Sequence, residues 1–465
     1  MDKRLGLLIE TANLLSRYTR KMVEQSTVNS NQSLSYANKH VLAPMVRIGT
    51  LPVRLLSLRY GADIVYCEEI IDFKMLQATR MVNKVLGTVD YRLSDGDIVF
   101  RTCEEEREKL VFQMGTSDPE RAVRVARMVE QDVSGIDVNM GCPKDYSIKG
   151  GMGAALLSHP DKIKAILEAL VAGVKIPVTC KIRILPSIEE TINLAKMIEK
   201  TGVKAIGVHG RRKEERSSEP CHNDIIKQVA QALSIPVIAN GGSNEINKYE
   251  DIIRFRDETA ASSVMVARAA QWNPSVFRKE GLLPVEDVLK EVMKIAIDYD
   301  NEFVNTKYIV CKMIREVCKN EVGIKLAASR DIEDIASALG LSEYYQNSLN
   351  QRNKREGELS DENGPSCKRR KTESYIEMDV TYNKKLYPRT VSPKQIVYEY
   401  SKKMGWENPV FETIRNEKDD TFKSVLNLNK FKYSSVLSGK NKRVAEQLAA
   451  KAFLSFYNMH DGRLK

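Results

Sequence analysis

The sequence predicts an α/β protein whose main part, residues 38–282, is a (β/α)8 TIM barrel. Short apolar runs rich in β-branched residues alternate there with helical patterns over roughly 240 residues, the usual length of this barrel. Eight such runs match its eight strands. They are Val41–Val46, Ala62–Cys67, Leu110–Met114, Gly135–Asn139, Pro177–Ile184, Ala205–His209, Pro236–Ala239 and Ser262–Ala267.

Helical spacing fills most of the gaps between these runs. The clearest segments are Pro119–Gln131, Pro160–Ala172 and Ile188–Lys200. Two of them begin with proline, preceded by Asp118 or His159 in the cap region, and proline is favoured in the first turn of a helix. The competing fold is an open doubly wound sheet, which should show G-x-G-x-x-G after its first strand. None is present there, so the barrel is favoured.

Three further regions follow the predicted barrel. Residues 283–345 have helical periodicity without strands, as in Val285–Asp298 and Lys307–Cys318, and predict a small helical domain. Residues 346–376 are polar and charged, which is typical of a flexible linker. Residues 377–465 form another unit, with a helix-like stretch, three β-type runs and a final amphipathic helix.

Composition limits the class of protein. The 465 residues are 42% hydrophobic, enough for a sizeable core, and no run of 18 uninterrupted apolar residues exists, so we expect no membrane span. Eight cysteines are scattered without a C-x-x-C pair, and only five histidines are present. We therefore expect neither a disulfide framework nor a metal site, and we expect a reducing intracellular compartment. The oligomeric state cannot be read from the sequence, and a monomer is the default expectation.

Residues 1–37 are an N-terminal extension without an assigned role. The first 30 residues contain acidic side chains and lack an apolar h-region, which argues against a secretory signal. The stretch is basic and partly helical in pattern, so a mitochondrial address stays open. The run "KRRK" at 368–371 fits solvated linker charge or a nuclear signal. We expect a cytoplasmic protein, with a nuclear or mitochondrial pool as the alternatives.

The segment "GIDVNMGCPK", residues 135–144, carries the strongest functional signal. An apolar run ends at Asn139 and is followed by Cys142, a lone thiol where a strand breaks into a loop. The glycine-rich "KGGMGAALL" follows at 149–157. A thiol in this position suits an active-site acid or nucleophile. Considered alone, a buried structural cysteine is an equal alternative.

Function in a (β/α)8 barrel lies at the carboxyl ends of the strands. Lys181 and Arg183 stand in an apolar run, and charged residues are seldom buried without a partner, which favours ligand contact over core snorkelling. Before the last two strands, the candidates at these ends are Ala43, Pro44, Met45, Gln113, Asn139, Cys142, Lys181, Arg183, His209 and Arg211. The backbone and thioether of the first three suit a flat ligand, and the amide of Gln113 suits a heteroaromatic ring edge.

The ends of the last two predicted strands indicate a phosphate site. Glycine lets backbone amides approach phosphate oxygens, and an arginine offers a bidentate fork. Loops after strands seven and eight are the usual phosphate grip of this fold. A simple turn and a surface ion pair are the alternatives. With Lys181 placed for the negative charge of a reduced flavin, this set predicts FMN. The residues are Asn240, Gly241, Gly242, Ala267 and Arg268.

These segments resemble the tRNA-dihydrouridine synthases. The likeness runs through nearly the whole chain from about residue 38, and the "NMGCP" block is its most specific part. It rests on "VLAPMVRIGTLPVR", "VFQMGTSDP", "GIDVNMGCPKDYSIKGGMGAALL", "VTCKIRI", "VHGR", "VIANGG" and "VMVARAA". The resemblance implies that FMN, reduced by NADPH (or NADH), passes hydride to C6 of a flipped-out tRNA uridine while Cys142 protonates C5. A thiol pKa of about 8.5 keeps that proton in place near neutrality.

The same resemblance implies substrate contacts. Asn139 and Arg211 are expected to bond the uracil edge, and Arg183 to contact the substrate nearby. Arg47 and Lys144 are expected at RNA phosphate. His209 is expected to donate to the flavin or to the substrate, although a lone histidine is more often structural.

The C-terminal unit carries the chain's charge. Residues 365–465 hold 21 basic and 11 acidic residues, which accounts for the whole formal net charge of +10. The α-β-β-β-α order resembles the double-stranded-RNA-binding domain of the eukaryotic synthase type that acts on uridine 20 of the D-loop. One departure is the acidic loop 416–421, which lacks the usual Gly-Pro-x-His. The expected RNA contacts are Lys384, Lys385, Lys394, Lys440, Lys442 and Arg443.

Two other functions stay open. An FMN barrel enzyme that reduces a free pyrimidine would explain Cys142 and the flavin site but would leave the basic C-terminal unit without a use. A non-catalytic or regulatory RNA-binding protein on a retired enzyme scaffold would explain that unit but not the full set of strand-end residues.

Overall fold

The structure is a computed structural model that describes residues 34–314, 321–363, 375–388, 391–417, 419–457 and 459–463. Most of the predicted N-terminal extension, Cys318, Cys367 and the "KRRK" segment lie outside these ranges. In the described part, no helix combines the length and the apolar character needed to cross a membrane.

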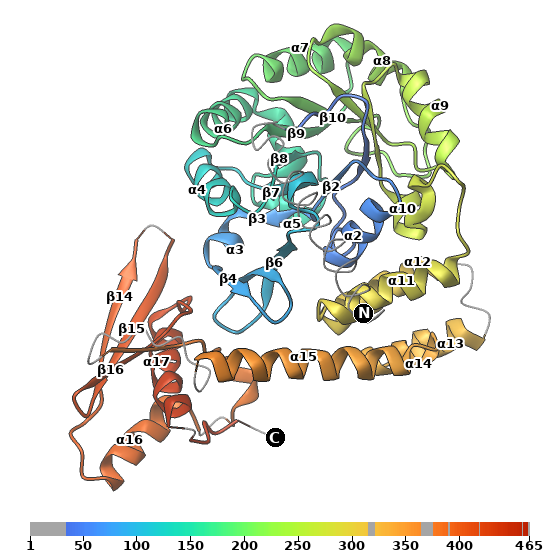
Figure 1. The fold of residues 1–465 in the computed structure, drawn as a ribbon. Coiled ribbons are helices and arrows are strands. Elements are labelled where there is room, and N and C mark those ends of the chain that lie inside the picture. The colour runs from blue at the N-terminus through green and yellow to red at the C-terminus, as the bar shows by residue number, and fades with distance from the viewer. Residues whose placement is uncertain are drawn as a thin grey trace, which may run out of the picture. The chain divides into compact units, whose positions relative to one another are not determined.

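Eight parallel strands form a closed barrel, as predicted (Figure 1). The order is β2-β1-β12-β11-β10-β9-β8-β7, and pairing of β2 with β7 completes the ring, which excludes the open sheet. Because all of these pairs are parallel, their carboxyl ends meet at one mouth. The strands are β1 His40–Leu42, β2 Ile64–Tyr66, β7 Leu110–Gly115, β8 Gly135–Met140, β9 Val178–Arg183, β10 Ala205–His209, β11 Val237–Asn240 and β12 Ser263–Val266.

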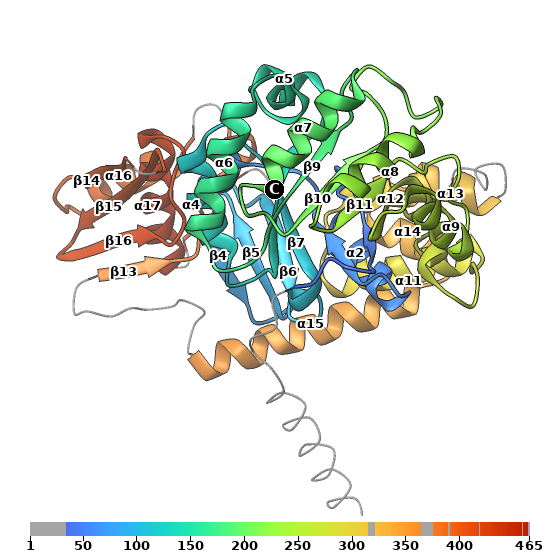
Figure 2. The same ribbon diagram turned by 90° about the horizontal axis from the view of Figure 1, so that it is seen from above.

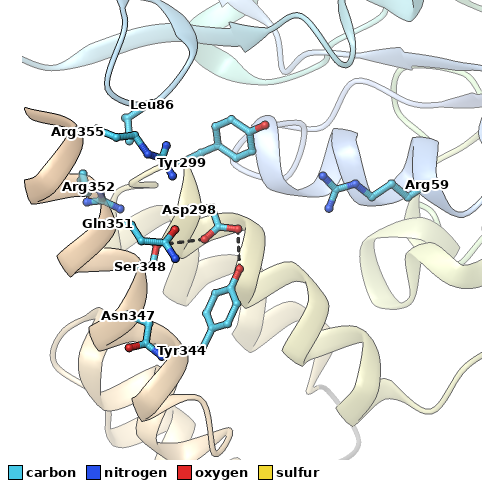
Figure 3. A pocket seen from close by; sticks show the side chains of 10 residues that line it. All are labelled: Arg59, Leu86, Asp298, Tyr299, Tyr344, Asn347, Ser348, Gln351, Arg352 and Arg355. Carbon is cyan, nitrogen blue, oxygen red and sulfur yellow. Dashed lines mark hydrogen bonds between the residues drawn. The ribbon is translucent and has the colours of Figure 1, made fainter. Parts of the chain in front are cut away.

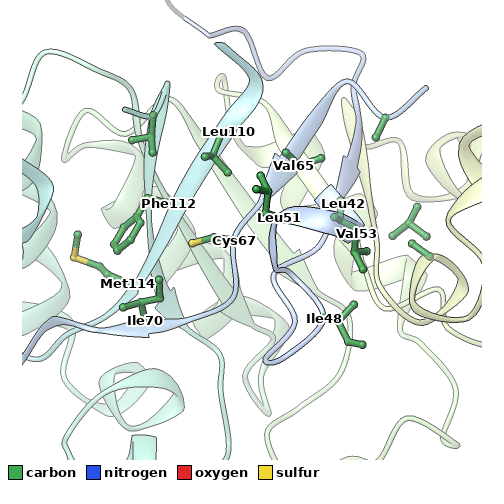
Figure 4. Packing of buried hydrophobic residues seen from close by; sticks show 14 of the residues in the cluster. Leu42, Ile48, Leu51, Val53, Val65, Cys67, Ile70, Leu110, Phe112 and Met114 are labelled. Carbon is green, nitrogen blue, oxygen red and sulfur yellow. The ribbon is translucent and has the colours of Figure 1, made fainter. Parts of the chain in front are cut away.

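Helices surround the strands, and a continuous apolar core lies between the two layers. Leu42 of β1, Val65 of β2 and Phe112 of β7 are fully buried in it (Figure 4). Asp118 caps α4 by accepting from the Arg121 N–H at 2.8 Å, whereas His159 at the start of α6 makes no such bond. The helices are α2 Leu51–Arg59, α4 Pro119–Val129, α6 Pro160–Gly173, α7 Ile188–Glu199, α8 Asn223–Ala232, α9 Tyr249–Thr259 and α10 Arg268–Trp272.

An insertion between the second and third barrel strands was missed by the sequence analysis. It contains β3 Ile70–Ile71, α3 Asp72–Leu76 and a three-stranded antiparallel sheet of β4 Thr79–Asn83, β5 Thr88–Arg92 and β6 Ile98–Cys103. The glycines at 87 and 96 supply positive φ angles of 69° and 99° at its two turns. Arg101 forms two bonds of 2.6 Å with the buried Asp90, which joins β6 to β5.

The helical region extends further than predicted. Its helices are α11 Val285–Asp298, α12 Phe303–Met313, α13 Glu321–Ala328, α14 Ile332–Ala338 and α15 Ser342–Asn363. The predicted linker at 346–376 is therefore wrong as far as residue 363. Its Gln, Glu, Lys and Arg residues are strong helix formers, and Lys354 and Glu358 form an i,i+4 pair. Helix α15 is one long element in both views (Figures 1 and 2).

Contacts with α11 explain why this polar helix is ordered. Asp298, the last residue of α11, accepts hydrogen bonds from Tyr344 Oη at 2.7 Å and from Ser348 Oγ at 3.1 Å (Figure 3). Arg352 adds an ion pair with Asp300 at 2.6 Å. The groove in Figure 3 has a volume of about 480 Å³ and is lined by none of the predicted site residues.

The C-terminal unit has the predicted α-β-β-β-α order. Its elements are α16 Pro393–Lys403, β14 Val410–Asn416, β15 Thr421–Leu428, β16 Phe431–Ser435 and α17 Lys442–Phe456. A further strand, β13 Tyr375–Met378, pairs in parallel with β16. It starts inside the predicted linker, so the unit begins before residue 377. Tyr433 of β16 and Phe453 of α17 meet edge to face, with ring centroids 5.1 Å apart in the core.

Candidate active site

The barrel register brings the predicted residues together at the mouth. Asn139 of β8 lies beside Lys181 of β9, and Arg183 lies beside His209 of β10. His209 in turn is level with Asn240 of β11. Four neighbouring strands therefore contribute candidate residues at two adjacent levels, Asn139 with Lys181 and, two residues nearer the carboxyl ends, Arg183 with His209 and Asn240.

The loop that carries Cys142 is fixed by side chains from two strands. Asn139 Oδ1 accepts hydrogen bonds from the backbone N–H groups of Gly141 and Cys142, both at 3.0 Å. Arg183 Nε donates to the Gly141 carbonyl at 2.8 Å, and its Nη1 donates to the Arg212 carbonyl at 2.8 Å. Arg183, predicted to contact substrate, thus braces the loops after β8 and β10.

Arg211 requires a correction. It was predicted to bond the uracil edge, but only 1% of its surface is exposed. Its Nε donates to the Glu219 carbonyl at 2.9 Å and its Nη1 to the Gly241 carbonyl at 2.6 Å. These two bonds make Arg211 a brace for the glycine loop after β11, while its Nη2 is buried without a hydrogen-bond partner within the described ranges.

The Cys142 thiol is half-buried and lies in a polar chain. Its Sγ is 3.8 Å from Tyr146 Oη, and Tyr146 Oη donates to Glu69 Oε2 at 2.8 Å. Burial, and then the negative charge of Glu69, raise the pKa of the thiol above its ordinary value. The thiol therefore stays protonated at neutral pH, which suits a proton donor better than a nucleophile.

Sequence reasoning missed Tyr146 and Glu69. Glu69 follows β2, the strand whose carboxyl end received no candidate, and Tyr146 lies four residues after Cys142 in α5 Asp145–Lys149. The available signals were a carboxylate at a barrel strand end and the i,i+4 spacing to the thiol.

Beneath the mouth, Asp137 accepts from Gln113 Nε2 at 2.8 Å and Thr179 Oγ1 at 2.7 Å. Gln113, predicted at a ring edge, is buried and its amide nitrogen bonds this carboxylate. Burial raises the pKa of Asp137 to about 6. Burial, with the charge of Arg183, lowers the pKa of Lys181 to about 8.

Positive charge is in excess around His209. Its pKa is well below the ordinary value because of burial and because Lys181, Arg183, Arg211 and Arg268 all act on it, so the imidazole is neutral. Cations gathered from β9, β10 and the start of α10 disfavour one another unless an anion joins them. This electrostatic arrangement fits a phosphorylated, electron-accepting ligand such as FMN.

The predicted phosphate residues line one small cavity. Its lining includes Asn240, Gly241, Gly242, Ala267 and Arg268. Gly241 has a φ of 125°, and a Cβ there would lie 2.5 Å from Cys221 Sγ, so the close backbone turn requires glycine. Asn240 Nδ2 donates to the Met265 carbonyl at 2.8 Å and ties the end of β11 to β12.

The loop after β1 borders the mouth from the other side. Ala43 is buried and its N–H donates to the Val266 carbonyl at 2.9 Å, whereas Pro44 and Met45 are half-buried. Arg47 is exposed with a φ of 66°, and its guanidinium carbon lies 5.4 Å from the Tyr308 ring centroid. Lys144 is exposed next to α5. Arg47 and Lys144 are therefore accessible to an approaching RNA.

Two protein-family models match the chain. The family model described as Dihydrouridine synthase (Dus) matches residues 41–368, more than half of the chain. The chain belongs to the dihydrouridine synthase family. A second model, the double-stranded RNA binding motif, matches residues 393–457.

Similar family members come from yeasts. A tRNA-dihydrouridine(20) synthase (NAD(P)+) of Schizosaccharomyces pombe is 39% identical over 316 residues, which cover 66% of this chain and 65% of that protein. The chain thus spans just under two thirds of that relative. The protein of the same name from Saccharomyces cerevisiae is 35% identical over 384 residues, covering 76% of this chain and 98% of the relative.

One solved structure matches a fifth of the chain. A crystal structure of a variant RNA-binding domain of human tRNA dihydrouridine synthase (20) is 32% identical, covers 20% of this chain and 99% of that chain, and has a TM-score of 0.20.

Within this dihydrouridine synthase, most of the predicted RNA contacts are free to bind. Lys384 and Lys385 are exposed in the 3-10 turn Lys384–Leu386. Lys440, Lys442 and Arg443 are exposed around the first turn of α17. The helix dipole disfavours cations at a helix N-terminus. Binding of a phosphate there would explain why these three basic side chains lie together.

Lys394 differs from the other predicted RNA contacts. Its Nζ pairs with Glu446 at 2.7 Å and lies 4.6 Å from the Phe411 ring centroid. Its backbone N–H also donates to Gln447 at 2.9 Å. Because these contacts join α16 to α17 and β14, Lys394 has a structural role within the domain, and its contact with RNA stays a prediction.

Among the described ranges, no group of three or more His, Cys, Asp or Glu side chains is arranged to hold a metal ion.

Proposed function

We propose that this protein reduces uridine to 5,6-dihydrouridine in the D-loop of tRNA, at position 20. The observation that carries the proposal is a protonated thiol, Cys142, held at a barrel mouth beside a cation-rich, glycine-lined cradle. The relatives named as tRNA-dihydrouridine(20) synthases support the position on the substrate. We further propose that the protein is a cytoplasmic monomer.

The residues at the mouth suit FMN. The amides of Gly241 and Gly242 and the Arg268 side chain would hold its phosphate, while Lys181 and neutral His209 would lie along its ring system. When bound and reduced by NADPH or NADH, FMN supplies the hydride for C6 of uracil. The NAD(P)+ in the names of the relatives supports a nicotinamide reductant.

The protein's own contribution is proton delivery and positioning. Cys142 gives its thiol proton to C5 of the uracil, and Asn139 fixes the backbone that carries the thiol. Arg183 braces the same loop from β9. The target base must leave its stack, at a cost of a few kcal/mol that is lower for a loop nucleotide.

The C-terminal unit supplies affinity for RNA. Its exposed Lys440, Lys442 and Arg443 would lie against phosphates, and their attraction is strongest at low salt. Binding of tRNA by the basic unit explains its positive charge, whereas reduction of a free pyrimidine would not require such a unit.

The test is a reaction of the purified full-length protein with tRNA that lacks dihydrouridine, with NADPH as the reductant. We expect a yellow preparation that releases FMN and forms dihydrouridine at position 20. Free uridine, tested in parallel, should react far more slowly. Equal turnover of free uridine would favour the free-pyrimidine enzyme, and RNA binding without flavin or turnover would favour the non-catalytic protein.

A further inference from the structure

Glu69, Tyr146 and Cys142 form a continuous chain from two segments, the connection after β2 and the connection after β8. Tyr146 Oη lies between the other two groups, 3.8 Å from Cys142 Sγ and 2.8 Å from Glu69 Oε2. Glu69 comes from the loop after β2, Cys142 from the loop after β8, and Tyr146 from α5. The Tyr146 side chain is 49% exposed, but its hydroxyl points inward to this pair.

The carboxyl of Glu69 is placed to take up a proton. Its Oε1 is buried without a hydrogen-bond partner within the described ranges, and the Cys142 thiol lies close enough to act directly on the pKa of the carboxyl. An unsatisfied buried carboxylate oxygen is costly, and a proton on the group removes much of that cost. A second negative charge close by strengthens this tendency.

Turnover creates such a charge. Each dihydrouridine takes one proton from the Cys142 thiol and leaves a thiolate, which must regain a proton before the next uridine is reduced. A nucleotide bound at the mouth would restrict direct access of water to the sulfur. A route through the protein would avoid this restriction.

We propose that Glu69 and Tyr146 return a proton to Cys142 after each turnover. Tyr146 gives its hydroxyl proton to the Sγ thiolate, and its oxygen receives the carboxyl proton of Glu69. Glu69 is ionised before turnover and takes this proton from solvent once the thiolate has formed, so one proton enters for each proton delivered to C5 and the carboxylate is restored. The inference rests on the proposed role of Cys142 as the acid, and both residues act through that thiol as positioning residues.

Other charged groups also face the thiol. Lys181 and Arg183 of β9 interact with it electrostatically, as Glu69 and Tyr146 do from the opposite segments. Arg183 does not release protons at neutral pH, and Lys181 is assigned to the cofactor. Glu69 and Tyr146 are therefore the groups available for proton return.

The first experiment separates the first turnover from later ones. With pre-reduced holoenzyme in excess over tRNA, the rate of dihydrouridine formation reports the first proton transfer. With tRNA in excess and NADPH present, the same rate reports repeated turnover. Tyr146→Phe should keep the single-turnover rate within about twofold and lower repeated turnover about tenfold or more. Wild-type repeated turnover, or an equal loss in both assays, would overturn the inference.

A matched control is available on α15. Tyr344 donates to Asp298 at 2.7 Å, which is the same tyrosine–carboxylate contact away from the mouth. Tyr344→Phe should leave both rates unchanged. If the wild-type protein itself forms no dihydrouridine, the proposed function fails; if only the Tyr146→Phe expectation fails, the function stands and proton return is wrong.

A second experiment does not depend on activity. The rate at which iodoacetamide alkylates Cys142 in the holoenzyme is followed against pH by peptide mass spectrometry. Glu69→Gln removes the charge that disfavours the thiolate, so the midpoint should move to lower pH and the thiolate fraction at pH 8 should rise several-fold. Asp298→Asn should leave the profile unchanged. An identical profile for Glu69→Gln and wild type would overturn the coupling.

Discussion

The side-chain oxygen of Asn139 accepts a hydrogen bond from the backbone N–H of Cys142 at 3.0 Å. The same oxygen also accepts a hydrogen bond from the Gly141 N–H. The Asn139 side chain therefore fixes two consecutive residues of the loop that carries the thiol. A reacting group that is displaced by about 1 Å can lose about 10²-fold in rate.

Asn139→Ala should therefore lower dihydrouridine formation by about 10²-fold while FMN content stays normal. The measurement is single-turnover formation of dihydrouridine with the flavin content fixed from its absorbance. Thr413→Ala, which removes a hydroxyl contact in the C-terminal sheet, serves as a control. A rate for Asn139→Ala close to that of wild type would show that the loop is held by other contacts.

A buried ion pair supports the loop after β1. Arg54 bonds Glu106 at 2.7 and 2.6 Å and donates to the Gly49 carbonyl at 2.6 Å, with 2% and 0% of the two charged side chains exposed. Arg54→Met leaves the Glu106 charge buried without a partner. We expect a loss of about 3–5 kcal/mol in the free energy of unfolding, measured by urea denaturation.

The neighbouring exposed pair is the matched control. Arg59 Nε lies 2.8 Å from Glu105 Oε1, and the two side chains are 45% and 41% exposed. Arg59→Ala should therefore lower the free energy of unfolding by no more than about 1 kcal/mol. The double variant Arg54→Met with Glu106→Leu should recover much of the loss, because no charge stays buried. Equal effects of Arg54→Met and Arg59→Ala would contradict this assignment.

Flavin affinity should depend on pH through Lys181. Its pKa is about 8 in the protein without flavin, so the ammonium is present below that pH and lost above it. FMN binding to the apoprotein should weaken as pH rises from 7 to 9. Asp137, with a pKa of about 6, is already ionised in this range and does not confuse the result.

Lys181→Met should weaken FMN binding at pH 7 by about 10-fold or more and make it independent of pH between 7 and 9. Fluorescence titration of the apoprotein with FMN measures both effects. A steep pH dependence that survives in Lys181→Met would assign it to another group.

RNA affinity should fall when the first turn of α17 loses its cations. Replacing Lys440, Lys442 and Arg443 by alanine should weaken tRNA binding and lower the magnitude of the salt slope, by about 0.7–0.9 for each phosphate that is no longer neutralised. Lys394→Ala is the comparison, because Lys394 pairs with Glu446. It should destabilise the domain and leave the slope of the folded protein unchanged. Unchanged domain stability together with a smaller salt slope for Lys394→Ala would assign an RNA contact to Lys394.

The periodic parts of the chain were predictable and the exceptions have physical reasons. The strands around Phe112 and Val208 are apolar except for Gln113 and the terminal His209, and such nearly continuous apolar runs are typical of a parallel sheet covered on both faces. The sheet of β4, β5 and β6 was missed because its strands mix charged and apolar residues. Helix α15 was taken for a linker because its order depends on contacts with Asp298 and Asp300, far away in sequence.

The site was predictable where a motif marks a strand end, as at Cys142 and Gly241. The site was not predictable where the role of a residue depends on contacts with residues that are distant in sequence. Arg211 looks in sequence like a substrate contact, yet its bonds to the Glu219 and Gly241 carbonyls bury it. Glu69 and Tyr146 join the site only through the meeting of two loops.

The most direct test of the account is Cys142→Ala, assayed with pre-reduced holoenzyme and unmodified tRNA. The variant should bind FMN and oxidise NADPH as the wild type does, since the thiol contributes to neither. Dihydrouridine formation should fall by about 10²–10⁴-fold, the usual contribution of a general acid. Formation at the wild-type rate would contradict the central claim that the Cys142 thiol delivers the proton to C5.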